Sequence, residues 1–366
     1  MRGMNQSAEV LFKLIHVALG IEKNISLPNV VNWQEVFLLA NRQGVDALVW
    51  TDMLSEHSDE LGISEGIKYK WIGHQAIVEK DNGRRFQALR SLGSLWQTEG
   101  ISPLILKGLS YAVLYPIPFH RKSCDLDSYL FDRWEDGNVI VERNGIKVSR
   151  NFYKDSSFTY HGLRVENHKY CTPIRGGKKR KKYELFLRGL LEGSNLEKLP
   201  GTFFYTPPPL FNLLFFLSHA QNHFLNEGGI QLRHVCDWGV LMQKYTSEKV
   251  GQNDLWDDVL RYSRQYGFHS FLFSISQVAR KVCGVQIPFE CPINEKADTA
   301  LLNEILCPTC EQVEFSKGWK TRKMLVKSMI QSRWKYKLFS EESMYKVLLK
   351  SVSSFLFEKN PVLKET

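Results

Sequence analysis

The 366-residue chain has no long hydrophobic run. The apolar stretch Leu210–Leu217 is far shorter than the about 20 residues that a membrane-spanning helix needs. The apolar run Leu11–Leu19 is interrupted by Lys13 and His16, which is typical of one face of a helix and not of a signal peptide. We therefore expect no membrane partner and a cytoplasmic location.

Cysteine is also scarce. The seven cysteines are an odd number spread over a long chain, which argues against a secreted disulfide framework. Cys307 and Cys310 form a C-x-x-C pair, but a structural zinc site needs two more ligands at suitable spacing. Cys283 and Cys291 lie nearby at irregular spacing, so we favour free thiols over zinc.

Acidic residues are fewer than basic ones, 39 against 48, which leaves a net charge of +9. This surplus suits an anionic partner such as a nucleotide, a nucleic acid or a phosphorylated substrate, although it also serves solubility alone. Its densest part is the basic block, residues 175–182, which we expect to be a mobile loop. The block is either solvated or in contact with nucleic acid.

Hydrophobic residues make up 43% of the chain and charged residues 24%, which is ordinary for a globular protein and argues against disorder. The patterns predict an α+β fold in three parts. A small mixed sheet at 100–205 is the expected core. Apolar residues at helical spacing predict a helical region at 1–99 and a helical domain at 206–366.

Within the core, Ile101–Leu106 and Cys124–Phe131 are short apolar runs that predict strands. Pro103 places the first strand at an edge or marks its first residues. The pattern from Asn138 to Cys171, which includes Val139–Val141, is β-like, and Asn144-Gly145 predicts a hairpin turn.

Asp125-Leu126-Asp127 is the most informative tripeptide. Residues i and i+2 of a strand share a face, so the two carboxylates would lie side by side and repel each other. Mg²⁺ or Mn²⁺ would relieve this repulsion, because hard divalent ions take carboxylate and phosphate oxygens. A lone D-x-D is common on surfaces. Its context favours phosphate chemistry, since Lys107-Gly108 lies between a strand and a helix and Arg121 lies just upstream.

These residues resemble a known family. The run Leu104-Ile105-Leu106-Lys107-Gly108, then Tyr115-Pro116, Arg121 and Asp125-Leu126-Asp127, is similar to the bacterial uncharacterised nucleotidyltransferase family of the polymerase-beta-like superfamily. The segment Trp33–Val45 resembles the N-terminal helix of that family. The family's helical pattern H-x-x-x-H followed by L-R-x-x-x-D is matched by His219, His223, Arg233 and Asp237.

The resemblance implies metal-dependent transfer of a nucleoside monophosphate from a nucleoside triphosphate to an acceptor, with release of pyrophosphate. Asp125 and Asp127 would hold Mg²⁺ or Mn²⁺. The segment Val165-Glu166-Asn167-His168 is similar to the family's V-E-x-H, which makes Glu166 the third carboxylate, acting on the nucleophile or the metal, and puts His168 in the cleft. A solvent-facing strand residue is the alternative for Glu166. The nucleotide would be held by Lys107, Gly108, Ser110 and Arg121, although better-studied members of the superfamily have Gly-Ser at this helix start, which leaves these phosphate contacts less defined.

Two alternatives stay open. His219 and His223 share a helix face and could bind metal, but no glutamate of the zinc-protease type lies between them, so we interpret them as cleft residues. The whole chain could also be a non-catalytic nucleotide- or nucleic-acid-binding protein that keeps the fold. The acceptor, the preferred base and the oligomeric state are not predicted.

Overall fold

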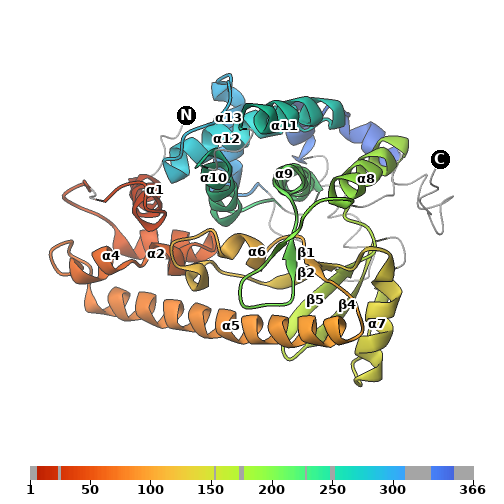
Figure 1. The fold of residues 1–366 in the computed structure, drawn as a ribbon. Coiled ribbons are helices and arrows are strands. Elements are labelled where there is room, and N and C mark those ends of the chain that lie inside the picture. The colour runs from red at the N-terminus through yellow and green to blue at the C-terminus, as the bar shows by residue number, and fades with distance from the viewer. Residues whose placement is uncertain are drawn as a thin grey trace.

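The computed structural model describes residues 6–23, 26–151, 154–172, 177–226, 229–247, 252–309 and 331–349. It confirms the predicted α+β class. A single seven-stranded mixed sheet lies among helices, with α5 and α7 on one side and the C-terminal helices on the other (Figure 1).

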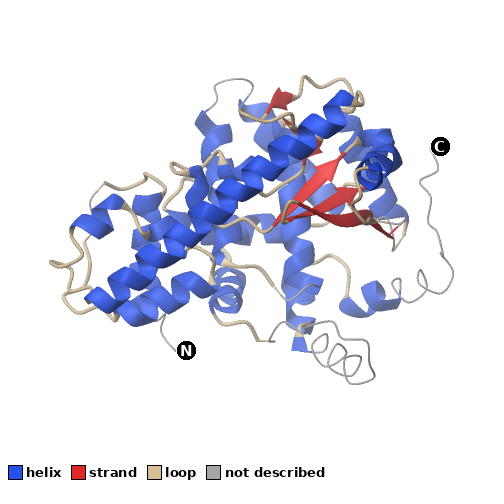
Figure 2. Ribbon diagram, turned by 90° about the horizontal axis from the view of Figure 1, so that it is seen from below, coloured by secondary structure: helices blue, strands red, loops and turns tan. Residues whose placement is uncertain are grey.

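The N-terminal region is helical, as predicted. Its helices are α1 (Gln6–Ala18), α2 (Trp33–Arg42), α3 (Asp46–Val49), α4 (Asp52–Glu56) and α5 (Glu65–Thr98). Helix α5 has 34 residues, which corresponds to a length of about 50 Å. Its second half places Leu89, Leu92 and Trp96 in the same apolar cluster as the sheet residues Leu126 and Val165. Helix α5 therefore packs against one face of the sheet (Figure 2).

The strands are β1 (Leu104–Ile105), β2 (Asp125–Tyr129), β3 (Ser149–Asn151), β4 (Asp155–Tyr160), β5 (Leu163–His168), β6 (Glu197–Lys198) and β7 (Tyr205–Thr206). Their order in the sheet is β3-β4-β5-β2-β1-β7-β6. Strand β2 pairs in parallel with β5 and antiparallel with β1. Pro103 does not mark an edge strand, because β1 lies between β2 and β7; it immediately precedes the first residue of β1.

One strand prediction and one turn prediction were wrong. Val139–Val141 lies within helix α7 (Trp134–Arg143), and Asn144-Gly145 follows the end of that helix instead of forming a hairpin. The physical reason is that Asn and Gly also end helices, so the pair is an ambiguous signal. The hairpin turn is formed instead by His161 and Gly162, which join β4 to β5 with φ angles of 47° and 79°. Positive φ at both residues is required by the two-residue turn that best matches the twist of the strands.

The remaining elements are α6 (Leu109–Ala112), η1 (Pro118–His120), η2 (Phe131–Arg133), α8 (Lys178–Leu191), α9 (Pro209–Asn226), α10 (Leu232–Ser247), α11 (Gln252–Tyr266), α12 (His269–Cys283), α13 (Glu295–Leu306) and α15 (Arg333–Phe339). The C-terminal region is therefore helical, as predicted. Residues 344–349 are also helical. The expected three-part division stays a prediction, since one apolar cluster runs from α1 through the sheet to α15.

The basic block was predicted to be a loop, but Lys178–Lys182 form the start of helix α8. Its first residues, Arg175 and Gly176, lie outside the described residues, as does Cys310 of the C-x-x-C pair. The cysteines of the described residues, Cys307 among them, are free thiols.

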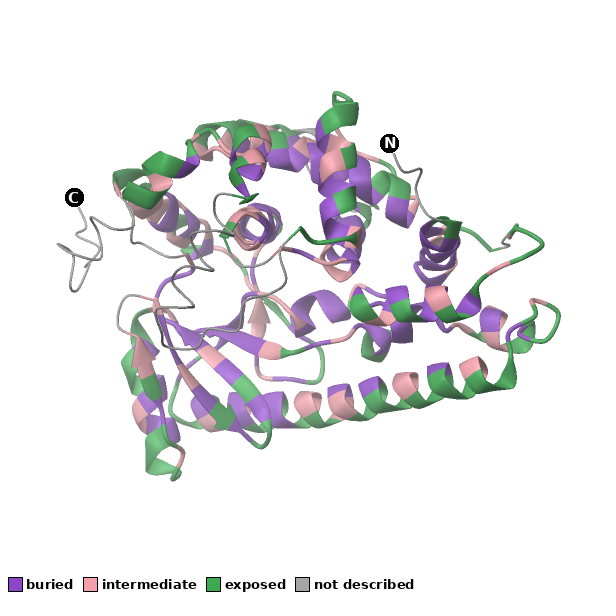
Figure 3. Cartoon of the chain, turned by 180° about the vertical axis from the view of Figure 1, so that it is seen from behind, coloured by how far each residue is buried: buried purple, intermediate pink, exposed green. Residues whose placement is uncertain are grey.

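The two faces of the sheet differ in character. Leu126 of β2 and Val165 of β5 are completely buried against α5 and α7. Their neighbours Asp125, Asp127 and Glu166 therefore point to the opposite face, toward the C-terminal helices, because side chains alternate along a strand. Figure 3 shows buried residues gathered on the inward sides of the helices around the sheet. No helix in the described part of the chain is long and apolar enough to cross a membrane.

Candidate active site

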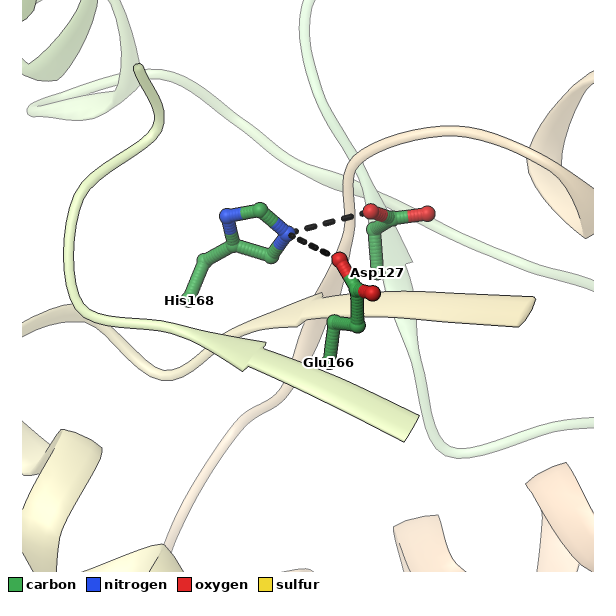
Figure 4. A group of neighbouring side chains, drawn as sticks. All are labelled: Asp127, Glu166 and His168. Atoms are coloured by element: carbon green, nitrogen blue, oxygen red, sulfur yellow. Dashed lines mark hydrogen bonds and ion pairs between the residues drawn. The ribbon is translucent and has the colours of Figure 1, made fainter. Parts of the chain in front are cut away.

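The site is built on the pairing of β2 with β5. Asp127 lies directly opposite Glu166, and Tyr129 opposite His168, in the parallel register. Ligand atoms of Asp127, Glu166 and His168 all lie within 4.8 Å of one another. Figure 4 shows the imidazole of His168 turned toward both carboxylates. The three groups therefore lie together on one face of the sheet, where strand alternation predicted the carboxylates to be.

A cavity of about 320 Å³ opens above these residues. Asp125, Asp127, Glu166 and His168 line it on the sheet side, together with Lys107. The other sides are formed by α8, α9, the end of α11 with the turn that follows it, and residues between 336 and 347. The wall residues from these elements include Lys179, Arg180, Phe215, His219, His223, Tyr266 and Glu341. The cavity therefore joins an acidic floor to walls that carry cations and aromatic rings.

Asp127 is held between two nitrogen groups. Its Oδ2 atom lies 2.8 Å from Nζ of Lys107, and its Oδ1 atom lies 3.0 Å from Nε2 of His168. Burial by itself would raise the pKa of Asp127, but Lys107 and His168 hold that pKa well below its usual range. Burial would likewise lower the pKa of Lys107, but Asp127, Asp125 and Glu166 outweigh it and raise the pKa. Both groups are therefore charged at neutral pH.

Glu166 is more accessible than Asp127, with 19% of its side chain exposed against 2%. It lies 3.3 Å from Nη2 of Arg164, 3.8 Å from Nζ of Lys154 and 4.0 Å from Nε2 of His168. The alternative reading of Glu166 as a solvent-facing strand residue does not fit a side chain that lines a cavity beside Asp127.

The donor set fits a divalent cation. It offers the carboxylates of Asp127 and Glu166, with the imidazole of His168 beside them, and Asp125 lies two residues before Asp127 on the same face and lines the same cavity. Oδ2 of Asp127 is buried and lies 2.8 Å from Nζ of Lys107. Carboxylate oxygens suit both Mg²⁺ and Mn²⁺.

Gly108 and Ser110, predicted to hold phosphate, do not line the cavity. Gly108 has φ +77°, and a Cβ atom there would lie 3.3 Å from the backbone oxygen of Asp125. Glycine at this position thus lets the turn after β1 pass close to the start of β2. Ser110 is buried in the single turn of α6.

Arg121 was predicted to bind phosphate, but its guanidinium is buried and bonded to Asp237. Nε donates to Oδ1 and Nη2 to Oδ2, both at 2.7 Å, and Nη1 donates to Ser123 Oγ at 3.3 Å. Tyr115 donates its hydroxyl to Oδ1 of the same aspartate at 2.7 Å. Arg121 and Asp237, which come from two separate motifs of the sequence, therefore form one structural contact away from the cavity.

Residues 119–124, which we call the lead-in segment, run directly into β2 and are held by side chains from distant elements. Asn82 of α5 donates to the carbonyls of Phe119 and Arg121 at 2.7 and 2.9 Å. Arg85 donates to the carbonyl of Ser123 at 2.7 Å. Arg233 of α10 donates to the carbonyl of Lys122 at 2.9 Å, so its place is beside the segment and not in the cavity.

The histidines of α9 lie where cleft residues were expected. His219 and His223 both line the cavity, with ring centroids 4.4 Å apart, and His219 stacks on Phe215 at 5.7 Å. Burial, followed by the charge of Lys107, lowers the pKa of His219 well below its usual value. His219 is thus a neutral ring that lines the cavity. Neither histidine belongs to the cluster of metal-ligand type found among the described residues.

Several residues that line the cavity were not predicted from the sequence. Lys154 sits between Glu166 and Asp155, at 3.8 and 2.9 Å, and Lys179 and Arg180 enter the cavity because the basic block is a helix. Residues 336–347 reach the cavity from the far end of the chain. No local pattern marks Lys154, whereas the basic block was visible as a charge run whose helical state was misjudged.

One protein family resembles the chain in sequence. Residues 29–284 match the model of a protein family described as "Uncharacterised nucleotidyltransferase". No curated protein and no solved structure matches the chain. The mixed sheet makes the chain an α+β protein, and the segment that matches the family model includes this sheet. The matched segment covers well over half of the chain, and the protein belongs to this uncharacterised nucleotidyltransferase family.

Proposed function

We propose that the protein is a metal-dependent nucleotidyltransferase that transfers a nucleoside monophosphate from a nucleoside triphosphate to an acceptor and releases pyrophosphate. The observation that carries this proposal is the register of β2 and β5. It sets Asp127 against Glu166 on the floor of a cavity that Asp125 also lines. Family membership supports the reaction class.

Asp125 and Asp127 would hold Mg²⁺ or Mn²⁺, with Glu166 and His168 beside them. When bound, the ion would neutralise phosphate charge and orient the triphosphate. Lys107 and Lys154 line the cavity beside the carboxylates and would bind phosphate oxygens. Arg121 is not part of this set, because its guanidinium is committed to Asp237.

In the reaction that we propose, an acceptor hydroxyl forms a bond to the α-phosphorus. The bond from that phosphorus to the bridging oxygen breaks, and pyrophosphate leaves with the electron pair. Glu166 accepts the proton of the hydroxyl, because it is the most exposed member of the described carboxylate–imidazole cluster. Positioning and charge neutralisation supply most of the rate enhancement.

The acceptor is not identified by the site. Lys179 and Arg180 line the cavity, and Lys178 and Lys182 are exposed next to them on α8, so a nucleic acid is one acceptor that this surface would suit. Such an acceptor would bind less tightly as salt rises. Replacing Lys178, Lys181 and Lys182 by Ser should then flatten that salt dependence, and an unchanged slope would reject nucleic acid.

A non-catalytic nucleotide-binding protein is the second candidate. One observation favours it: Nζ of Lys107 lies 2.8 Å from Oδ2 of Asp127, so a cation of the protein itself balances the charge of this carboxylate. The two functions differ in pyrophosphate release, which only the transferase produces.

The proposal is tested by the Asp125→Asn, Asp127→Asn double variant. Amides cannot replace anionic ligands of a hard cation, so Mg²⁺-dependent binding of ATP should be lost while the fold is retained. Calorimetric titration with and without Mg²⁺ measures this. Metal-dependent affinity equal to that of the wild type, in a folded variant, would remove the metal site from these residues.

A further inference from the structure

The rim of the cavity holds an ion pair that the proposed chemistry does not use. Nζ of Lys179, in the first turn of α8, lies 3.0 Å from Oε2 of Glu341, which follows α15. Both side chains line the cavity, and 43% and 51% of their surfaces are exposed. Ion pairs with this exposure contribute little to stability, so an incoming anion can replace the carboxylate easily.

The ion pair lies against the backbone of Gly267, in the turn before α12. Gly267 has φ +89°, and a Cβ atom there would lie 2.9 Å from Oε2 of Glu341 and 3.0 Å from Nζ of Lys179. Gln221 donates from Nε2 to the carbonyls of Gly267 and Phe339, at 3.1 and 2.6 Å. The amide thus ties the turn before α12 to the C-terminal segment, and glycine leaves room for the two charged groups.

The positive charges around Lys179 are in an electrostatically unfavourable position. Helix α8 begins with five consecutive cations, Lys178–Lys182, and has no acidic residue in its first turn. The first turn of a helix carries partial positive charge, so cations there are unfavourable and anions are stabilised. An anion beside Lys179 offsets this repulsion, and Glu341 supplies one in the protein alone.

We propose that Lys179, with Arg180 beside it, is an anion subsite of the cavity that takes a phosphate group, and that Glu341 occupies it until the ligand arrives. The identity of the ligand rests on the proposed function: the phosphate belongs either to the triphosphate of the nucleotide or to a phosphorylated acceptor. Carboxylate and phosphate oxygens both bind an ammonium group, so a phosphate can take the place of the Glu341 carboxylate at Lys179.

The test uses the full chain and inorganic tripolyphosphate in buffer with EDTA, so that no metal site takes part. Lys179→Gln should weaken tripolyphosphate binding about 5- to 10-fold. Glu341→Gln removes the competing carboxylate and should tighten it about 2- to 5-fold. In the Lys179→Gln background, Glu341→Gln should have no effect, because there is no ammonium left to free.

Lys178→Gln is the matched control, since it removes the same charge from an exposed neighbour that does not line the cavity. An equal loss with Lys178→Gln and Lys179→Gln would show a general charge effect and overturn the subsite. Unchanged or weaker binding by Glu341→Gln would overturn the exchange. Lys179→Arg keeps the charge and should retain most of the affinity, which separates the subsite from a folding defect.

Two further arms separate the sources of the phosphate. If the triphosphate fills the subsite, Lys179→Gln weakens ATP binding with Mg²⁺ and leaves binding of a single-stranded oligonucleotide unchanged. If an acceptor fills it, the oligonucleotide is affected and ATP is not. The Asp125→Asn, Asp127→Asn variant should keep its tripolyphosphate site in EDTA, so failure of the proposed metal chemistry and failure of this subsite give different results.

Discussion

Arg121 and Asp237 form a buried, two-pronged ion pair that joins the lead-in segment to helix α10, with both N···O distances at 2.7 Å. The two residues are 116 positions apart in the chain. The contact fixes the start of β2 against the helical region, so it bears on the site through position and not through contact with a ligand.

The first prediction concerns this pair. Arg121→Met should lower the free energy of unfolding by about 3–5 kcal/mol, because Asp237 is left as an uncompensated buried charge. Adding Asp237→Leu should recover much of this loss, since no lone charge remains. Urea denaturation measures both variants. An Arg121→Met protein of unchanged stability but weakened triphosphate binding would restore the phosphate role that its position in the sequence indicates.

The second prediction concerns Arg233, which bonds the carbonyl of Lys122 in the lead-in segment. Arg233→Met should raise the Mg²⁺ concentration needed for nucleotide binding roughly 10-fold, because groups behind metal ligands set their orientation. Arg261→Met is the control, since Arg261 is exposed and forms an ion pair with Asp258, three residues away on the same helix. An equal metal requirement in both variants would contradict the positioning of Asp125 by this segment.

The third prediction concerns Lys107. Lys107→Met leaves Asp127 buried without its cation, which should cost about 3 kcal/mol of stability in EDTA. Mn²⁺ should then raise the melting temperature of the variant more than that of the wild type, because the ion replaces the lost charge. Lys154→Met, at a more exposed ion pair, should cost less than about 1 kcal/mol. Equal shifts of the melting temperature by Mn²⁺ in the Lys107 variant and the wild type would show that Lys107 is not part of the metal site.

The fourth prediction concerns Glu166. Glu166→Gln keeps the size of the side chain but removes its basicity, so turnover should fall at least roughly 100-fold while ATP affinity changes little. Glu142→Gln is a matched control, because Glu142 lies on α7 in an ion pair with Arg150 and does not line the cavity. Near-normal turnover by Glu166→Gln would show that another residue is the third acid. Asp155, beside Lys154, would be the next residue to test.

The sequence predicted the parts of this molecule that local periodicity determines. Helices α9 and α10 follow from apolar spacing, and β2 follows from its short apolar run and its alternating aspartates. Glu166 was predicted as the third carboxylate only with the help of the family resemblance. Its register opposite Asp127 was not predicted, since no local rule gives the register between two strands.

The rest depends on contacts between distant segments. The guanidinium of Arg121 is equally suited to phosphate and to a carboxylate, and only the fold shows that Asp237 takes it. Lys178–Lys182 is a charge run that favours a loop, but the apolar residues after it, such as Leu187 and Leu191, pack into the core and draw the block into a helix. The cavity wall at Glu341 comes from the far end of the chain and has no local signal.

The measurement that tests the central claim most directly is transfer of label from ATP. The protein is incubated with Mg²⁺ or Mn²⁺, an extract that supplies acceptors, and ATP labelled at either the α- or the γ-phosphate. We predict that α-label enters a product and γ-label is released as pyrophosphate, and that the Asp125→Asn, Asp127→Asn variant does neither. Transfer of γ-label to the product, or α-label transfer that persists in the folded variant, would contradict nucleotidyl transfer at this site.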